Sequence, residues 1–351
     1  MTELTHPTSP AHLDGKLARL LGAVEPLQPD LLNADAPRPK PRRWWHNAGI
    51  RFLFTVLVWL FLTMLGGFIG GVTGLVALGP MTPTATVYVT LVLIVASLLA
   101  YLALTLVFEG RRPPIELAPR RAGGLLTGLL IGGGLNALCL GIMALLGAFQ
   151  VTGTNPAYEW GIPMLTAGLQ AAVFEEIAFR GVMFRLVEEG LGTWGALAIS
   201  ASVFGAVHLT NENGTVIGAV CVALAGVLLG VLYALTRSLW LVMGLHAAWN
   251  IVQGPVFGVV VSGTSQTGSG FLVSRTLGPE WLSGGPFGME ASVVTLVVLA
   301  ASSALVGWLI VKRKVLVQPA WVRRRLLSAE SGTTPTAPRE VPASPTPTEA
   351  S

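Results

Sequence analysis

Charged residues are scarce in this sequence. Asp, Glu, Lys and Arg make up 11% of its 351 residues, whereas an ordinary soluble domain carries about 25%. A chain with so few charges cannot cover a globular surface that faces water. Hydrophobic residues make up 52%, the 42 glycines exceed the usual share of about 7%, and the mean hydropathy is +0.66. Low charge with abundant glycine is typical of packed transmembrane helices, so the composition excludes soluble enzymes and indicates a polytopic membrane protein.

Several signatures of well-known hydrolases are also missing. The two cysteines, Cys139 and Cys221, both lie in apolar segments and are too few for a disulfide framework or a cysteine-rich metal site. The three aspartates, Asp14, Asp30 and Asp35, all precede the first long apolar segment, so the apolar segments contain no aspartyl dyad. Neither Gly-x-Ser-x-Gly nor His-Glu-x-x-His occurs, which removes the serine-elbow and helical zinc-protease patterns.

The net charge of +4 does not indicate a nucleic-acid partner, because of where the basic residues stand. They cluster at the ends of apolar segments, where Lys and Arg determine the orientation of membrane helices. The clusters are Arg38–Arg43, Arg111–Arg112, Arg120–Arg121, Lys312–Lys314 and Arg323–Arg325. We therefore predict contact with a lipid bilayer and none with nucleic acid.

Eight apolar segments come close to the length of about 20 residues that a bilayer crossing requires. They are 50–78, 86–108, 122–149, 161–187, 194–210, 215–236, 239–261 and 291–311. The sequence thus predicts an all-α fold, a polytopic membrane helix bundle of about eight helices over residues 47–315. No secretory signal peptide is visible, so the first segment is expected to act as an uncleaved insertion signal of a multi-pass protein of the cell membrane.

Two polar tails flank the predicted bundle. Residues 1–46 are Pro-rich and are predicted to be disordered or interfacial, with residues 12–21 able to lie on the membrane surface. Residues 316–351 are predicted as an interfacial and disordered C-terminal tail, which is rich in Ser, Thr, Pro and Ala from residue 328 onward.

The basic clusters also predict an orientation. With the N-terminus in the cytoplasm, every cluster falls on the cytoplasmic side. The opposite side then holds Arg275 with the acidic Glu159, Glu212, Glu280 and Glu290. The excess of Lys and Arg in cytoplasmic loops therefore predicts that both termini are cytoplasmic.

Ionisable residues inside the apolar segments are few, and each costs about 2.5–3.5 kcal/mol at a helix centre. They persist where they are paired or functional. The fourth, fifth and seventh segments contain Glu175, Glu176, Arg180, His208, His246 and Asn250.

Helical spacing separates the two adjacent glutamates. Glu176 and Arg180 are four residues apart in the favourable order for an ion pair. Glu175 is rotated by about 100° from Glu176 and has no partner on its own helix. A carboxylate in a low-dielectric site can act as a general base toward water. The sequence therefore predicts Glu175 as the base and a supporting role for Glu176 and Arg180.

The remaining polar residues suit the stabilisation of a developing negative charge. A neutral imidazole or amide can donate a hydrogen bond to the oxyanion that forms when water attacks an amide carbonyl. We predict that His208, His246 and Asn250 converge with Glu175 in a catalytic site for peptide hydrolysis without a covalent intermediate. This reading requires tilted or broken helices, since the three helices would otherwise place these residues at different depths.

Three alternatives remain open. One Glu and two His are a possible catalytic zinc site, although the usual ligand spacing is absent, so we expect no cofactor and keep zinc as the less favoured possibility. The same polar cluster can also serve only as structural support, in a non-enzymatic membrane scaffold or immunity protein. A proton-coupled transporter would use buried Glu and His too, but no pair of matched half-repeats is visible.

At these residues the chain resembles a known family. The motifs Glu175-Glu176-x-x-x-Arg180, Phe204-x-x-x-His208 and His246-x-x-x-Asn250 are similar to those of the CPBP intramembrane proteases, which include type II CAAX prenyl endopeptidases and bacteriocin-processing (Abi) proteins. The resemblance covers residues 161–255. It implies a metal-independent glutamate endopeptidase with a buried site that opens toward the cytoplasm and acts on a membrane-associated peptide or protein. A prenylated substrate is not implied.

The resemblance also implies roles for individual residues. By motif position, Glu175 is the water-activating base and His208 positions or activates the water. His246 and Asn250 stabilise the oxyanion, while Glu176 and its partner support the site.

Overall fold

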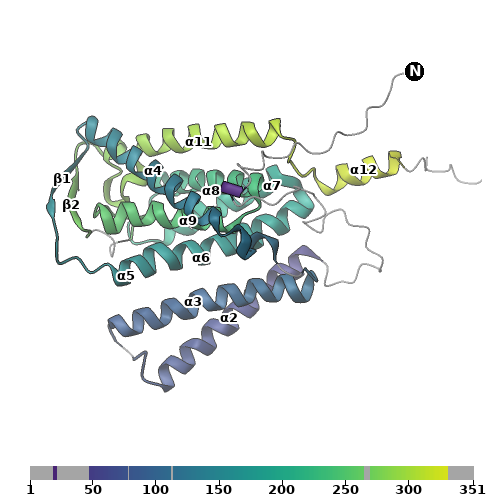
Figure 1. The fold of residues 1–351 in the computed structure, drawn as a ribbon, viewed down its shortest axis with the longest axis horizontal. Helices are drawn as coiled ribbons and strands as arrows, with labels where there is room; N and C mark the ends of the chain where they lie inside the picture. The colour runs from purple at the N-terminus through teal and green to yellow at the C-terminus, as the bar shows by residue number, and fades with distance from the viewer. Residues whose placement is uncertain (1–18, 22–46, 78, 112–113, 265–268, 331–351) are drawn as a thin grey trace, which may run out of the picture.

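The computed structural model of the chain describes residues 19–21, 47–77, 79–111, 114–264 and 269–330. Within these residues the fold is a polytopic helical bundle, as predicted (Figure 1). The proposed membrane-surface patch at residues 12–21 lies almost entirely outside the described residues, as does the tail beyond residue 330.

The long helices run roughly along one axis. They are α2 (Ala48–Val72), α3 (Pro83–Ala103), α4 (Gly123–Leu145), α7 (Arg185–Val207), α8 (Val216–Thr236), α9 (Leu239–Ile251) and α11 (Val293–Lys312). The shorter α-helices are α5 (Gly161–Pro163), α6 (Ala171–Glu176), α10 (Glu280–Ser283) and α12 (Ala320–Glu330). Asn47, Thr82, Thr215, Ser238 and Ser292 each begin a long helix by accepting a hydrogen bond from a backbone N–H of its first turn.

Wider and tighter helical turns connect these elements. The π-helical segments are Leu104–Phe108, Met164–Gln170, Ile177–Phe184 and Val252–Val256. The 3₁₀ segments are Ile115–Leu117, Pro119–Arg121, His208–Thr210, Gly285–Phe287 and Met289–Ala291.

Six helices in the described part of the chain are long and apolar enough to cross a membrane. They are Ala48–Val72, Pro83–Phe108, Pro119–Leu145, Gly161–Thr210, Val216–Thr236 and Val293–Lys312. Gly161–Thr210 contains two of the predicted segments and bends at Gly192, whose φ of 73° and ψ of 178° are not helical. The predicted segment 239–261 forms α9 and the π turn after it. The count of eight crossings and the cytoplasmic placement of both termini stay predictions.

The structure departs from the all-α prediction in one short sheet. Strands β1 (Phe149–Thr154) and β2 (Leu272–Thr276) pair antiparallel, with Phe149 opposite Thr276. The strands are more than a hundred residues apart in the chain, so no turn sequence between them indicated a hairpin.

The two ends of the bundle differ in chemistry. We call one the basic end, where α3 stops and α4 begins and where α8 and α11 stop. It carries Arg51, Arg111, Arg120, Arg185, Arg237 and Lys312, and it lies toward α12 in Figure 1. The opposite end, which we call the loop end, carries the sheet and residues 208–215, 257–264 and 269–290.

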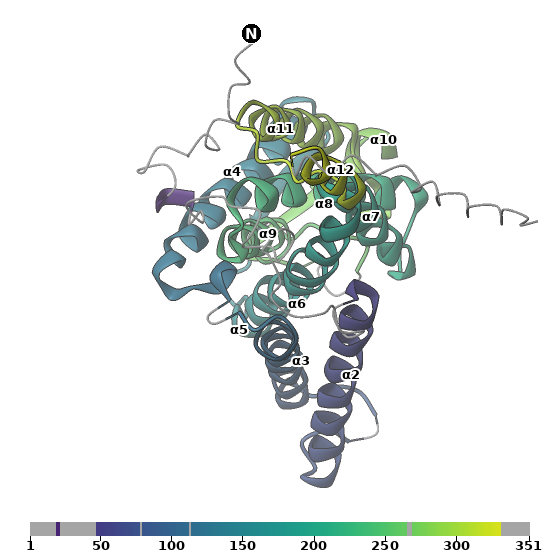
Figure 2. The same cartoon turned by 90° about the vertical axis from the view of Figure 1, so that its right-hand side faces the viewer.

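Buried ion pairs lock the basic end together. Glu109 accepts hydrogen bonds from Arg185 at 2.7 Å, from Arg111 at 2.9 Å and from Arg51 at 3.1 Å. Arg51 also pairs with Glu189. Since these residues come from α2, α7 and the chain after α3, the network attaches α2 to the rest of the protein. Elsewhere α2 and α3 project from the bundle (Figure 2), and α2 exposes large apolar side chains such as Phe61 and Phe68, as a lipid-facing helix does.

The pH dependence of stability should report on this network. Burial alone would raise the pKa of Glu109, but the guanidinium groups of Arg185, Arg111 and Arg51 outweigh burial and lower the pKa below its ordinary value of 4.5. A lowered pKa in the folded state means that ionised Glu109 stabilises the fold above pH 4.5 and that this contribution is lost as the pH falls through the lowered pKa. We expect Glu109→Gln to lower the melting temperature in detergent at pH 7, and the gap from wild type to narrow below pH 4.5. A gap that does not change with pH would contradict this assignment.

Helix α9 lies at the centre of the bundle between α4, α6 and α8 (Figure 2). Its contact with α4 is unusually close, because a Cβ atom on Gly132 would lie 2.1 Å from the carbonyl oxygen of Leu245, and one on Gly128 would lie 2.1 Å from that of Leu241. Small residues allow such backbone approach between membrane helices. Gly226 and Gly230, which are four residues apart on α8, similarly face Ala201 and Leu197 across the contact of α8 with α7.

Gly132→Ala should therefore push α4 away from the helix that carries His246. We expect a loss of about 1–3 kcal/mol of stability, as for other overpacked cores, with a lower melting temperature and lower folded yield. Gly134→Ala is the matched control, since no atom lies within 4 Å of a Cβ at that position. Equal melting temperatures for the two variants would show that the α4–α9 contact tolerates separation.

Candidate active site

The two glutamates stand in a helix whose turns are widened on both sides. Glu175 and Glu176 end α6, with the π-helical segments Met164–Gln170 before it and Ile177–Phe184 after it. π-helical turns are uncommon and occur frequently at functional sites. The amide of Asn250 on α9 donates a hydrogen bond of 2.9 Å to the carbonyl oxygen of Ala167, which fixes the first π segment against α9.

Glu176 is fully buried, and one of its carboxylate oxygens accepts two hydrogen bonds. Its Oε1 accepts a hydrogen bond of 2.8 Å from Arg180 Nη1, the predicted i,i+4 pair, and another of 2.8 Å from His246 Nδ1. Arg180 also donates to the carbonyl oxygen of Gly226 on α8 at 3.1 Å and lies 4.6 Å from the ring centre of Phe204. Glu176 thus does more than the sequence indicated: it orients the imidazole of His246. Nothing in the spacing of two residues 70 positions apart could have revealed this contact.

Glu175 is placed differently from its neighbour. Its side chain is 21% exposed, and its Oε2 lies 3.9 Å from His246 Nε2, which is too long for a direct hydrogen bond. Within the described residues, Oε2 is buried and has no hydrogen-bond partner. Because Nδ1 of His246 donates to Glu176, the other ring nitrogen of His246 faces this carboxylate.

His208 lies just beyond α7, in the 3₁₀ turn His208–Thr210. Its Nδ1 donates a hydrogen bond of 2.7 Å to the carbonyl oxygen of Phe204, since a carbonyl can only accept. In the neutral ring Nε2 is then an acceptor. The ring of Phe204 lies between the two histidines, with centroids 4.9 Å from His208 and 6.1 Å from His246.

Glu175, His208, His246 and Asn250 all line one cavity of about 720 Å³, which we call the site cavity. The four predicted catalytic residues therefore lie around a common space. The mismatch in depth disappears because the helix of Glu175 is widened into π turns and because His208 stands at the end of its helix, where the cavity begins.

The site cavity opens at the loop end. Its outer lining includes Tyr158, Asn211, Glu212, Thr264 and Ser269, which belong to the connections at that end. The resemblance implied an opening toward the cytoplasm, whereas the basic clusters predict that the basic end is cytoplasmic. These two expectations cannot both hold in this fold.

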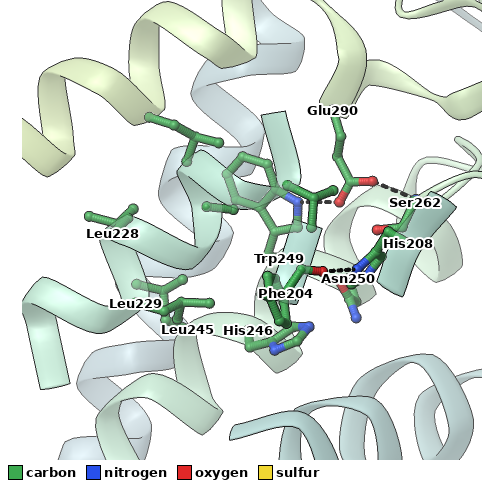
Figure 3. A pocket seen from close by; sticks show the side chains of 13 residues that line it. Phe204, His208, Leu228, Leu229, Leu245, His246, Trp249, Asn250, Ser262 and Glu290 are labelled. Atoms are coloured by element: carbon green, nitrogen blue, oxygen red, sulfur yellow. Dashed lines mark hydrogen bonds between the residues drawn. The ribbon is translucent and has the colours of Figure 1, made fainter. Parts of the chain in front are cut away.

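Sequence reasoning missed a second buried carboxylate beside the site. Glu290 accepts hydrogen bonds from Trp249 Nε1 at 3.1 Å and from the backbone N–H of Ser262 at 2.5 Å (Figure 3). Burial raises the pKa of Glu290, and its partners Ser262, His208 and Trp249 offset this only in part. Glu290 lies in the short 3₁₀ turn Met289–Ala291 and its partners are 28 and 41 residues away, so no helical spacing could have indicated these contacts.

The described residues include no group of three or more His, Cys, Asp or Glu side chains arranged to hold a metal ion. The expectation of a metal-free site stays a prediction, and so do the catalytic roles of the individual residues.

Comparison with known proteins gives one result that bears on this site. No curated protein matches the chain. Residues 158–252 match the family model of the type II CAAX prenyl endopeptidase Rce1-like proteins, and this segment contains all three motifs and every predicted catalytic residue. Residues 158–252 are thus similar to the type II CAAX prenyl endopeptidases of the CPBP family, the family that the motifs of the chain resemble.

Proposed function

We propose that this protein is an intramembrane endopeptidase in which Glu175 activates a water molecule to hydrolyse a peptide bond of a membrane-associated substrate. The observation that carries the proposal is the position of Glu175 Oε2. Glu175 lines the site cavity, its buried Oε2 lies 3.9 Å from His246 Nε2, and no described residue donates a hydrogen bond to this oxygen. The distance is too long for a direct hydrogen bond between the two side chains. The proposal places the reacting water between them, hydrogen-bonded to both.

The chemistry then requires one base and a set of donors. Glu175 takes a proton from water, and the hydroxide oxygen bonds to the carbonyl carbon of the peptide. The carbonyl oxygen becomes an oxyanion, which the second amide N–H of Asn250 can stabilise while its first N–H stays on Ala167. As the C–N bond breaks, the proton on Glu175 passes to the leaving amine, which leaves a carboxylic acid and an amine as products.

The two histidines support this scheme in different ways. His246 is held by the buried pair of Glu176 and Arg180, so its ring cannot rotate away from Glu175 without breaking a hydrogen bond to a carboxylate. His208 presents Nε2 to the cavity because its Nδ1 is used on Phe204. In the proposal, His246 is the doubly protonated imidazolium, whose Nε2–H orients the reacting water and donates to the oxyanion, and His208 positions the water from the loop-end side.

The test is direct detection of cleavage. Purified protein in detergent is incubated with a solubilised membrane proteome, and new peptide termini are identified by sequencing. We expect termini that appear with the wild-type protein and not with Glu175→Gln prepared in parallel. Identical sets of termini for the two proteins would overturn the proposal.

We further propose that the hydrolysis needs no metal. Among the described residues, no group of three or more His, Cys, Asp or Glu side chains is arranged to hold a metal ion, so we assign the two histidines roles as hydrogen-bonding groups. We expect full cleavage after dialysis against a strong chelator and less than stoichiometric zinc in the active protein. Stoichiometric Zn²⁺, lost together with activity on chelation and regained with it on re-addition, would contradict the prediction.

A further inference from the structure

We infer that the site cavity opens on the extracytoplasmic side of the membrane, so that its substrate is a polypeptide segment presented from that side, such as part of an exported or membrane-inserted protein. That the cavity receives a substrate rests on the proposed function. The direction of the opening does not, because it depends only on the position of the cavity and on the distribution of charge.

The mouth of the site cavity lies at the loop end. The cavity runs from Glu175, which lies between Gly161 and the bend at Gly192, to the exposed residues Glu212 and Ser269. Asn211 and Asn213 donate hydrogen bonds to the carbonyl oxygens of Ser262 and Gly263, so these connections lie together at the loop end.

Packed side chains separate the site cavity from the basic end. Between the buried pair Glu176–Arg180 and the basic end, the described chain is filled by Tyr101, Phe184 and Tyr233, each with no exposed surface. The rings of Phe184 and Tyr233 lie 5.6 Å apart, and the guanidinium group of Arg185 lies 5.9 Å from the ring of Tyr101. A peptide entering from the basic end would have to displace this packed layer.

The two ends of the bundle also differ in the charged side chains that they expose to solvent. Buried arginines such as Arg185 and Arg237 are neutralised by carboxylates, so their positions say little about the orientation of the protein in the membrane. Solvent-exposed cations at the basic end include Arg120, Lys312, Lys314, Arg324 and Arg325. Among the described residues, the loop end exposes a single cation, Arg275, together with Glu159, Glu212 and Glu280.

The asymmetry in charge therefore persists when only solvent-exposed residues are compared. Cytoplasmic loops of membrane proteins carry the excess of Lys and Arg, so the basic end faces the cytoplasm and the loop end faces outward. The exposed Trp160 and Trp281 at the loop end suit a second membrane interface, where Trp side chains are enriched. The active-site carboxylate is then reached from the extracytoplasmic side, in contrast to the opening that the resemblance implied.

Cysteine accessibility tests this inference. Ser269→Cys and Glu212→Cys mark the cavity mouth, Glu280→Cys marks the loop end away from the cavity, and Arg120→Cys and Lys312→Cys mark the basic end. The wild-type protein is the blank, because its cysteines are buried. Each variant is exposed to a membrane-impermeant maleimide, first in intact cells and then in sealed inverted membrane vesicles.

We expect the three loop-end variants to be labelled at least tenfold faster in intact cells than in inverted vesicles, and the two basic-end variants to show the opposite preference. Labelling of the loop-end variants only in inverted vesicles would overturn the inference. Glu280→Cys keeps the test valid if a substitution at the cavity mouth impairs folding.

The outcome can be separated from that of the proposed function. If labelling is as expected but Glu175→Gln cleaves peptides normally, the orientation stands and the proposed base is wrong. If the loop end proves cytoplasmic while Glu175→Gln is inactive, the protease proposal stands and the extracytoplasmic substrate is wrong.

Discussion

Replacing Glu175 with Gln should abolish peptide hydrolysis while leaving the protein folded. General base catalysis contributes roughly 10²–10⁴-fold to rate, and an amide cannot accept a proton from water, so we expect kcat to fall by at least that order. Stability should change little, because Gln is nearly isosteric and the carboxylate oxygen at the cavity has no hydrogen-bond partner among the described residues to lose. The measurement is a melting temperature and a peptide-cleavage rate for wild type and variant in the same detergent.

Glu159→Gln is a suitable control, since Glu159 is an exposed carboxylate at the loop end that does not line the site cavity. It should retain both stability and turnover. Near-normal turnover of Glu175→Gln would mean that another group is the base. Loss of folding together with activity would instead favour a scaffold or immunity protein that keeps the polar cluster for stability.

Glu176→Gln should have the larger effect on folding. Removing one member of a buried ion pair leaves the other charge uncompensated, which typically costs about 3–5 kcal/mol. Arg180 has no exposed surface, and its remaining hydrogen bond is to the carbonyl oxygen of Gly226. We expect a clearly lower melting temperature and a lower folded yield. Activity should fall as well, because His246 loses its ionised partner.

A double variant separates the charge effect from general damage. In Glu176→Gln with Arg180→Met, no charge is left unpaired and Gln can still accept a hydrogen bond from His246, so much of the lost stability should return. A double variant no more stable than Glu176→Gln would show that the guanidinium contacts to Gly226 and Phe204 matter more than the pair. If Glu176→Gln proves fully stable but inactive, Glu176 and not its neighbour is the base.

Local spacing accounts for the part of the site that the sequence could predict. Glu176 and Arg180 meet because residues four apart share a helix face, and Glu175 is turned away by the same geometry. The cost of placing charge in a membrane made His208, His246 and Asn250 stand out against an apolar background. These arguments need only one helix at a time, and four of the residues that they identified line the site cavity: Glu175, His208, His246 and Asn250.

Contacts between helices lay beyond such arguments. The hydrogen bond from His246 to Glu176 depends on how far α9 slides along α6, which is set by side-chain packing and by the close backbone approach of α9 to α4 at Gly132. The position of Glu290 depends on the path of a loop that carries no periodic pattern. The π turns around Glu175 are likewise invisible in the sequence, because the same residues are compatible with a regular helix.

The sequence by itself determined that this protein resides in a lipid bilayer and which ionisable side chains lie within its apolar segments. Low charge and eight apolar segments specify a membrane bundle, since the hydrophobic effect acts on composition and length alone. Only the tertiary structure decided that the site cavity begins at the loop end and that packed aromatic rings close the way from the basic end. The end at which the cavity opens depends on which helix ends surround it. This is set by how the helices pack together and cannot be read from any single helix.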